Sequence, residues 1–274
     1  MTARARVASV TLVAIAVLLG GTAAARNGVT SRSDPHRDWN ALLHRHVRGG
    51  LVDYDGFQRD RAILARYLES LAPSRATLLR TDEIAFWINA YNAATIELVV
   101  RERAARGGQL RSIRDIPAAW SRPRWKIAGE ERTLDEIEHE ILRKRFHEPR
   151  VHVALVCASR SCPALRPSAY EGEFLDAQLD SAAREFMLDP TRNRVRPDGG
   201  RVRLSKIFDW YAKDFAGAAR DPTLERIYGP ERGPVLAFAA RYLPAEEARA
   251  LRTSRYRIEY LPYDWSLNTI GNAR

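Results

Sequence analysis

Residues 81–100 read TDEIAFWINAYNAATIELVV and form the most strongly helical stretch of the chain. Thr81 can cap a helix, Asp82 and Glu83 suit its first turn, and the pattern stops near residue 105, before a pair of glycines. At about 100° per residue, the apolar side chains cover more than half of the helix circumference. The stretch therefore predicts a helix in the middle of the fold, around which the rest of the chain packs.

Shorter patterns on either side predict the remaining elements. Helices are expected over residues 59–71, 133–146, 168–186, 207–215 and 234–242, hairpins over 125–132 and 193–204, and strands over 151–156 and 256–260. The sequence thus predicts an α+β fold: a helix-rich single domain over residues 39–270, with a small, mostly antiparallel sheet and a buried central helix.

The composition supports a folded domain and argues against nucleic acid. The chain has 274 residues, 45% hydrophobic and 28% charged, with two cysteines, which excludes disorder and a small disulfide-stapled scaffold. Its net charge is +10, yet 40 of its 44 basic residues are Arg, scattered without a run of five. A broad Arg bias explains this charge as well as a phosphate-binding surface would, so we expect no nucleic-acid partner.

Residues 1–25 are typical of a secretory signal peptide. Two arginines precede an uncharged, almost wholly apolar run over residues 7–19, and small residues follow. We expect cleavage after Ala25 and a polar tether over residues 26–38. The apolar run is shorter than the ~20 residues that span a bilayer, although an uncleaved anchor stays open. The mature protein should be exported, to the periplasm or outside the cell, with no membrane span.

Residues 152–163 read HVALVCASRSCP and hold both cysteines. A buried strand would end at Cys157, and Pro163 suits the first position of a helix, which would leave Cys162 near its N-cap. A thiol there has a lowered pKa and lies beside backbone N–H groups that can stabilise an oxyanion. Alternatively, the cysteines form a disulfide, as an exported protein permits, if their Cα atoms come within about 7 Å. The sequence leaves both interpretations open.

A nucleophilic thiol needs a base and a group that orients the base. His152, in the same segment, and His139, on the preceding predicted helix, are the candidate bases. Glu138 lies on the apolar face of that helix, where a carboxylate must be neutralised, paired or near a cavity. Arg150 and His152 are its candidate partners, and a structural ion pair is the alternative role for Glu138.

Two asparagines, Asn89 and Asn92, lie on the predicted central helix. Asn is a poor helix former, so on a buried helix both side chains are expected to have hydrogen-bond partners. Either could orient a catalytic imidazole, as in a Cys-His-Asn arrangement. Bracing the backbone of a neighbouring loop is the alternative role.

Aromatic side chains and single charges gather near the C-terminus, over residues 204–211 and 260–268. Such mixtures line ligand clefts, and they also close cores over polar networks. The chain has no Walker loop and no G-x-G-x-x-G, G-x-S-x-G or H-E-x-x-H motif. Nucleotide, lipase-like and zincin chemistries therefore lose their main support, and no cofactor is expected.

Four motifs together resemble a known family. FWINAYN at 86–92, LDEIEH at 134–139, PRVHVALVC at 149–157 with SCP at 161–163, and DWSLN at 264–268 look like the domain of unknown function 547 family. Its members include exported bacterial proteins and have no assigned activity, so the resemblance implies export but no reaction. It marks as motif residues Asn89, Asn92, Glu138, His139, Arg150, His152, Cys157, Cys162 and Asn268. Ala158 stands where Gly is common in the family, which tightens the backbone there.

The leading functional hypothesis is an exported cysteine-dependent hydrolase or acyl transferase that acts on a peptide or amide bond. Cys162 would be the nucleophile and His152 the base, and Asn89 or Glu138 would orient the base. The candidate contacts to a peptide-like or small-molecule ligand are Asn92, His139, Arg150, Trp265 and Asn268.

Two other hypotheses come from different classes. One is a non-enzymatic ligand-binding or scaffolding domain with a Cys157–Cys162 disulfide and an aromatic cleft. The other is a metal site of His139, His152 and a cysteine, which lacks close ligand spacing, so we expect no metal.

Overall fold

In the computed structural model, the asparagine-bearing stretch forms α4, Arg80–Ala105, a helix of 26 residues. Every side chain from residue 84 to residue 100 is buried except that of Glu97, so α4 is apolar on all sides, as a helix inside a core must be. The expected buried central helix is confirmed. The N-cap is Leu79, which makes no side-chain cap bond, so Thr81 lies inside the helix instead of capping it.

The structure describes residues 35–73, 78–198, 200–217 and 219–272. These described residues form one compact unit. The expected signal peptide and most of the expected tether lie outside the described residues. The first helix begins at Arg37, two residues before the expected start of the domain. No helix in the described ranges is long and apolar enough to cross a membrane.

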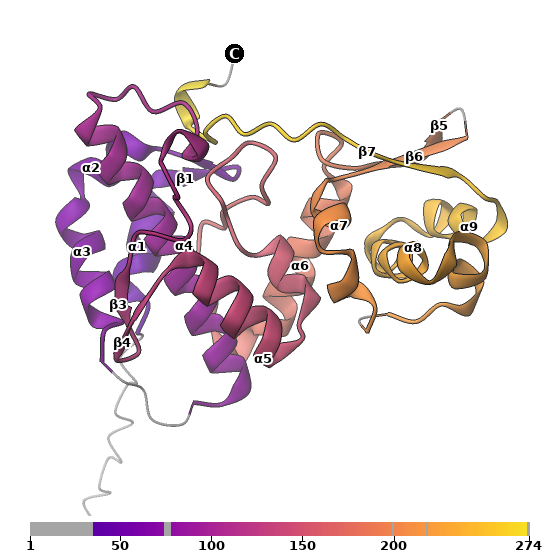
Figure 1. Ribbon diagram of the computed structural model, residues 1–274, viewed down its shortest axis with the longest axis horizontal. Helices are drawn as coiled ribbons and strands as arrows, with labels where there is room; N and C mark the ends of the chain where they lie inside the picture. The colour runs from indigo at the N-terminus through magenta and orange to yellow at the C-terminus, as the bar shows by residue number, and fades with distance from the viewer. Residues whose placement is uncertain (1–34, 74–77, 199, 218, 273–274) are drawn as a thin grey trace, which may run out of the picture. The chain divides into compact units, whose positions relative to one another are not determined.

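Short helices and two hairpins surround α4. Their bounds are Arg37–His46 (α1), Tyr54–Arg59 (α2), Arg61–Ser70 (α3), Val47–Arg48 (β1), Leu51–Val52 (β2), Trp125–Ile127 (β3) and Glu130–Arg132 (β4). Both hairpins, β1–β2 and β3–β4, are antiparallel. Figure 1 shows α2 and α3 beside α4, with which they are in contact.

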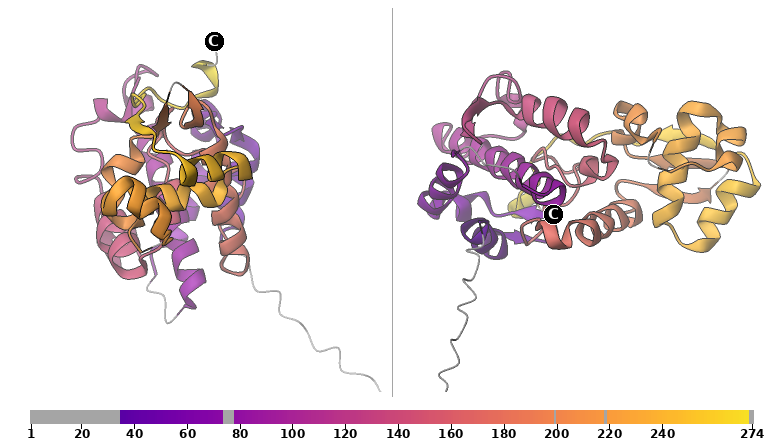
Figure 2. Two further views of the ribbon diagram at one scale, coloured as in Figure 1. Left: turned by 90° about the vertical axis from the view of Figure 1, so that its right-hand side faces the viewer. Right: turned by 90° about the horizontal axis from the view of Figure 1, so that it is seen from below.

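The C-terminal half of the chain builds a second hydrophobic cluster. Its elements are Leu175–Leu188 (α6), Arg194–Asp198 (β5), Arg201–Leu204 (β6), Ile207–Trp210 (α7), Pro222–Tyr242 (α8), Ala245–Thr253 (α9) and Arg257–Tyr260 (β7). In the three-stranded sheet, β6 pairs antiparallel with β5 and parallel with β7. Both views of Figure 2 show α8 and α9, coloured orange to yellow, packed beside each other. Helices and small, mostly antiparallel sheets confirm the α+β class.

The segment after β4 is a wider helix than expected. The Thr133 N–H donates to Glu136 Oε2 (2.8 Å) and the Glu136 N–H donates to Thr133 Oγ1 (3.1 Å), so the predicted capping box is present. The residues that follow, Glu136–Arg143, form a π-helix that continues into α5, Lys144–Phe146. A π-helical turn is rare and is frequently found at functional sites.

Three other predicted helices have different bounds. The helix expected from Ser168 begins at Leu175, after a 3-10 turn at Gly172–Phe174. The helix expected over 207–215 is α7 followed by a 3-10 helix at Ala212–Phe215. Helix α8 begins twelve residues earlier than expected, at Pro222, and is kinked at Gly229 (φ 84°).

The predicted strand over 151–156 is wrong. Residues Pro149–Val153 form a 3-10 helix with Pro at its start, and the next residues are irregular. Asn92 of α4 takes the place of a neighbouring strand, since its Nδ2 donates to Ala154 O (3.0 Å) and its Oδ1 accepts from the Val156 N–H (2.9 Å). The run is buried as expected, but the bonds of the 3-10 helix and the Asn92 side chain, and not a sheet, engage its backbone.

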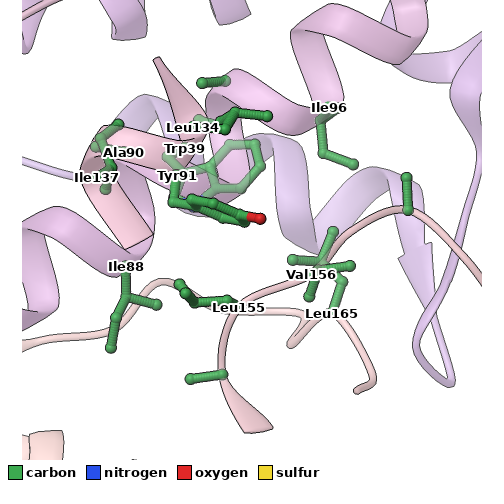
Figure 3. Close-up of a cluster of buried hydrophobic side chains, with 14 of the residues drawn as sticks. Trp39, Ile88, Ala90, Tyr91, Ile96, Leu134, Ile137, Leu155, Val156 and Leu165 are labelled. Atoms are coloured by element: carbon green, nitrogen blue, oxygen red, sulfur yellow. The ribbon is translucent and has the colours of Figure 1, made fainter. Parts of the chain in front are cut away.

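This loop packs into the main core next to α4. Figure 3 shows the side chains that meet there: Trp39 from α1, Ile88, Ala90, Tyr91 and Ile96 from α4, Leu134 and Ile137 from the segment at the π-helix, and Leu155, Val156 and Leu165 from the loop. The loop therefore lies against the most buried helix of the fold, which places its cysteines at a fixed position.

Candidate functional site

A cavity of about 280 Å³ lies where the cysteine loop meets the π-helix, α7 and the C-terminal segment. We call it the aromatic cavity. Its lining residues are Tyr91, Trp120, Asp135, Glu138, His139, His152, Leu155, Cys157, Cys162, Pro163, Ile207, Trp210, Tyr211, Tyr263 and Trp265. The lining joins six separate stretches of sequence, and it includes the predicted site residues Cys162, His152, Glu138, His139 and Trp265.

Four aromatic side chains form one wall of the cavity. Trp265 stacks on Trp210 with ring centroids 5.7 Å apart, and Tyr263 lies 4.5 Å from Trp265 and 4.8 Å from Trp210. Trp120 meets Trp265 edge to face at 6.2 Å. The two C-terminal aromatic segments seen in the sequence thus line a ligand-sized cavity, at the lower end of the usual size range.

Glu138, in the same lining, is a buried carboxylate that two phenols hold in place. It is 8% exposed, and it accepts hydrogen bonds from the Tyr91 O–H (3.1 Å) and the Tyr211 O–H (2.6 Å). Burial, together with the nearby Glu138 charge, raises the pKa of both tyrosines, so both phenols stay protonated and donate. The predicted need for a partner and a cavity is met, but the partners are tyrosines and not Arg150 or His152.

His152 is oriented by a residue that the sequence did not indicate. Its Nε2 lies 2.7 Å from Asp214 Oδ2, and its ring stacks on Tyr211 at 4.0 Å. Arg143 donates to both oxygens of Asp214, at 2.5 and 3.0 Å. Burial alone would raise the pKa of Asp214, but hydrogen bonds from His152 and Arg143 outweigh it and lower that pKa well below its usual range. Asp214 therefore takes the orienting role expected of Asn89 or Glu138.

His139 lines the cavity beside Glu138. Its Nδ1 accepts a hydrogen bond from Arg143 Nη1 at 2.9 Å and lies 3.9 Å from Glu138 Oε1. Asp135, one turn earlier, also lines the cavity, and burial raises the pKa of its carboxyl. The acidic side of the cavity thus carries two carboxylates and an imidazole within one stretch of helix.

Cys157 and Cys162 form a disulfide, with their Cα atoms 6.1 Å apart, within the separation that the bridge requires. The expected helix at Pro163 is absent, since residues 163–166 are irregular, and Cys162 is therefore not at a helix N-terminus. Ala158 adopts φ 60°, the left-handed region that favours glycine. That conformation gives a physical reason for the Gly that is common at this position in the resembled family.

The two asparagines of α4 do not line the cavity, and their side chains hydrogen-bond to the backbone of other segments. Asn89 Nδ2 donates to Tyr170 O (2.7 Å), and Asn89 Oδ1 accepts from the Tyr170 N–H (3.0 Å). Asn92 holds the cysteine loop in the same way, as described above. Both polar ends of Asn89 are engaged with Tyr170, so the structure gives it no contact with His152 among the described residues.

Arg150 and Asn268 also lie away from the cavity. Arg150 donates to Glu148 Oε2 and Asp180 Oδ1, both at 2.8 Å, within an ion-pair cluster that does not line the cavity. Asn268 accepts from the Tyr54 O–H at 2.7 Å and fastens the C-terminal segment to α2. Both motif residues act as anchors of the scaffold.

The proposed metal set of His139, His152 and a cysteine does not assemble. No group of three or more His, Cys, Asp or Glu side chains that could hold a metal occurs in the described part of the chain. Both sulfurs are bonded to each other, so neither is a thiolate ligand.

The comparison with protein families agrees with the motifs. Residues 75–187 match the family described as "Protein of unknown function, DUF547", so the resemblance is confirmed over that part of the chain. The match covers α4, the π-helix and both cysteines, and Asp214 and the C-terminal aromatic segment lie beyond it. No curated protein and no solved structure matches the chain.

Proposed function

We propose, from the cavity and not from the family, that this protein is an exported ligand-binding domain whose aromatic cavity holds a small organic cation. The ligand class is an amine attached to an apolar or aromatic group. Positively charged groups of peptides fall within this class.

The observation that carries this proposal is the charge of the lining. The chain carries +10, with 44 Lys and Arg against 34 Asp and Glu. None of the residues that line the cavity in the described structure is Lys or Arg, whereas Asp135 and Glu138 are both there. A cavity with two carboxylates and, in the described structure, no Lys or Arg in its lining suits a positively charged ligand.

Glu138 is prepared to accept a ligand N–H. Each of its oxygens already receives one tyrosine O–H, and a carboxylate oxygen keeps a further lone pair for another donor. The tyrosines fix the carboxylate before a ligand arrives, which reduces the entropy lost on binding.

The aromatic wall supports the same ligand class. The faces of Trp and Tyr rings attract cations, most strongly where water is excluded. The Arg114 guanidinium already lies over the Trp265 ring, 5.3 Å from its centroid. Its position supports the view that this wall accepts positive charge.

The experiment is a tryptophan-fluorescence titration with three probes of one shape, phenethylamine, 2-phenylethanol and 3-phenylpropanoate. Three lining tryptophans, Trp120, Trp210 and Trp265, should report binding. We expect the amine to bind at least about tenfold more tightly than the alcohol or the anion. Equal affinity for the three probes, or preference for the anion, would overturn the proposal.

Export has its own support and its own test. Residues 1–25 have the pattern of a signal peptide, and a disulfide is typical of proteins outside the cytoplasm. When the full chain is expressed in a bacterium with two membranes, mass spectrometry of the periplasmic fraction should find Arg26 as the first residue. Cytoplasmic protein that keeps residues 1–25 would contradict export.

A cysteine-dependent hydrolase is the second candidate, and the His152–Asp214 pair favours it. Cys162 and His152 line one cavity, and Asp214 holds the imidazole as the third member of a triad would. This chemistry requires Cys162 as a free thiol, and in the structure its sulfur is bonded to Cys157. Reduced protein should then release 4-nitrophenol from 4-nitrophenyl acetate in a burst that Cys162→Ala abolishes. A burst that survives in Cys162→Ala would exclude this mechanism.

A further inference from the structure

The Cys157–Cys162 disulfide lies open to the aromatic cavity. Both residues line it. The two sulfurs differ in access, because Cys157 is partly exposed and Cys162 is 2% exposed. Because Cys157 is the more exposed residue of the two, we expect a reagent in the cavity to reach its sulfur first.

Polar groups lie within hydrogen-bond distance of both sulfurs. The Cys157 N–H donates to Cys162 Sγ at 2.9 Å, and the Tyr263 O–H donates to the same sulfur at 3.3 Å. The Tyr263 oxygen also lies 3.3 Å from Cys157 Sγ, and Ser159 Oγ lies 3.2 Å from Cys157 Sγ. Donors aimed at a sulfur stabilise it as a thiolate, which makes it a better leaving group.

The loop between the cysteines is held in place by bonds other than the disulfide. The Arg160 N–H donates to Ser266 O at 2.9 Å, and the Asn268 N–H donates to Ala158 O at 3.1 Å. Arg192 Nε donates to the carbonyl of Cys162 at 2.7 Å. These contacts should keep both cysteines in position when the S–S bond is broken.

We propose that the Cys157–Cys162 disulfide is a thiol–disulfide exchange site that oxidises a dithiol entering the aromatic cavity. The inference goes beyond ligand binding and does not depend on it, because it rests on the sulfurs and their donors and not on the carboxylates.

The exchange has two balanced steps. A substrate thiolate attacks Cys157 Sγ, a mixed disulfide forms, and the S–S bond breaks with its electron pair leaving on Cys162 Sγ. The second substrate thiolate then attacks the substrate sulfur of the mixed disulfide, which forms the substrate disulfide and releases Cys157. The substrate loses two electrons and two protons, and the protein gains both as the thiols of Cys157 and Cys162.

Tyr263 positions the leaving sulfur. Burial raises the pKa of Tyr263 to about 12, so the phenol keeps its proton at neutral pH and can donate to the Cys162 thiolate. Phenylalanine at this position would keep the ring in the aromatic wall and remove only the donor.

The test measures reduction of the oxidised native protein by dithiothreitol, the dithiol probe, with acid quenching and mass spectrometry. In the absence of urea we expect the second-order rate constant to be about tenfold or more above its value in the unfolded protein, with one equivalent of oxidised dithiothreitol formed. A structural disulfide gives the opposite urea dependence, because it must be exposed by unfolding before it reacts. A rate constant that rises with urea overturns the proposal.

Two further measurements identify the sulfur and the donor. With glutathione as a monothiol probe, the mixed disulfide should map to Cys157, and a map to Cys162 contradicts the mechanism. Tyr263→Phe should slow the exchange several-fold with no change in the circular dichroism spectrum. The matched control is Tyr228→Phe, which removes a hydroxyl that donates to Ser254 O outside the cavity lining and should leave the rate unchanged. Equal rates for both variants refute the role of Tyr263.

Discussion

Replacing Asp214 with Asn removes the charge that holds His152 and Arg143 together. Asp214 lies in the 3-10 helix Ala212–Phe215, 62 residues from His152 along the chain. Its carboxylate accepts two hydrogen bonds from Arg143, at 2.5 and 3.0 Å, and lies 2.7 Å from His152 Nε2. Asn has the same shape but keeps only one acceptor oxygen and carries no charge.

The geometry sets the size of the expected loss. A hydrogen bond to a charged group that is shielded from water contributes about 1.5–3 kcal/mol to the free energy of unfolding. Solvent reduces this here, because the Asp214 side chain is 24% exposed and that of Arg143 is 28% exposed. The His152 side chain is only 2% exposed, so its contact is the drier one. We expect Asp214→Asn to lower the free energy of unfolding by about 2–3 kcal/mol, which corresponds to a fall in Tm of about 5–10 °C for a domain of this size.

The same substitution should change the pH dependence of stability. Since hydrogen bonds from His152 and Arg143 lower the pKa of Asp214 in the folded protein, Asp214 stabilises the fold at every pH above its unfolded value of about 3.9. That stabilisation is lost as the pH falls from the pKa of the unfolded chain through the lower pKa of Asp214 in the folded protein. The difference between wild type and Asp214→Asn should therefore be constant near neutral pH and shrink below about pH 4.

The assay is urea unfolding followed by circular dichroism at several pH values. Asp209→Asn is the matched control, since Asp209 pairs with Lys206 at 3.0 Å on the surface, with side chains 41% and 37% exposed. It should cost less than about 1 kcal/mol. An Asp214→Asn loss no larger than that of the control, or one that grows as pH falls below about 4, would refute the reasoning.

Three further substitutions test the cysteine loop. Ala158→Gly should raise the free energy of unfolding by up to about 1 kcal/mol, because the left-handed φ of 60° costs an L side chain about that much; a lower urea midpoint would contradict this. Asn92→Ala should lower the free energy of unfolding by about 2–3 kcal/mol, since two buried backbone groups lose their hydrogen-bond partner. A loss below about 1 kcal/mol would show that these groups find another partner. Replacing Cys157 and Cys162 together with Ser should lower it by about 2 kcal/mol, the chain-entropy value for so short a loop, with an unchanged circular dichroism spectrum; loss of helical signal would show that the other loop contacts are insufficient.

Much of the fold could be predicted from the sequence because its signals are local. Helix α4 follows from apolar residues on every side, and the capping box of Thr133 and Glu136 needs only residues three apart. The β3–β4 hairpin is likewise marked by its own turn, at Ala128 and Gly129. In each case the chain within a few residues determines the element.

The errors occur where a distant side chain decides the backbone. The run over 151–156 has strand composition, yet its first residues form a 3-10 helix and the carboxamide of Asn92 bonds Ala154 O and the Val156 N–H. Similarly, Pro163 suits a helix start, but Arg192 takes the carbonyl of Cys162 and the chain continues without a helix. Propensity is a weak guide against such tertiary bonds.

The candidate site could be predicted only in part. The motifs indicated Cys162, His152 and Glu138, because unusual residues stand out in apolar surroundings. Their partners Asp214 and Tyr263 come from segments that are 62 and 101 residues away along the chain. Nothing in the local sequence around Asp214 or in the aromatic cluster says which residue either will meet.

The most direct test of the account is a calorimetric titration of phenethylamine into wild type, Glu138→Gln and Glu140→Gln. Glu140 is the matched control, because it lies on the same π-helix with its side chain 56% exposed and paired with Lys144 at 2.6 Å. If the aromatic cavity binds cations through Glu138, the amine should bind to wild type and Glu140→Gln with equal affinity, and about tenfold or more weakly to Glu138→Gln. Absence of binding to wild type, or unchanged affinity in Glu138→Gln, would contradict the claim that the aromatic cavity is a cation-binding site.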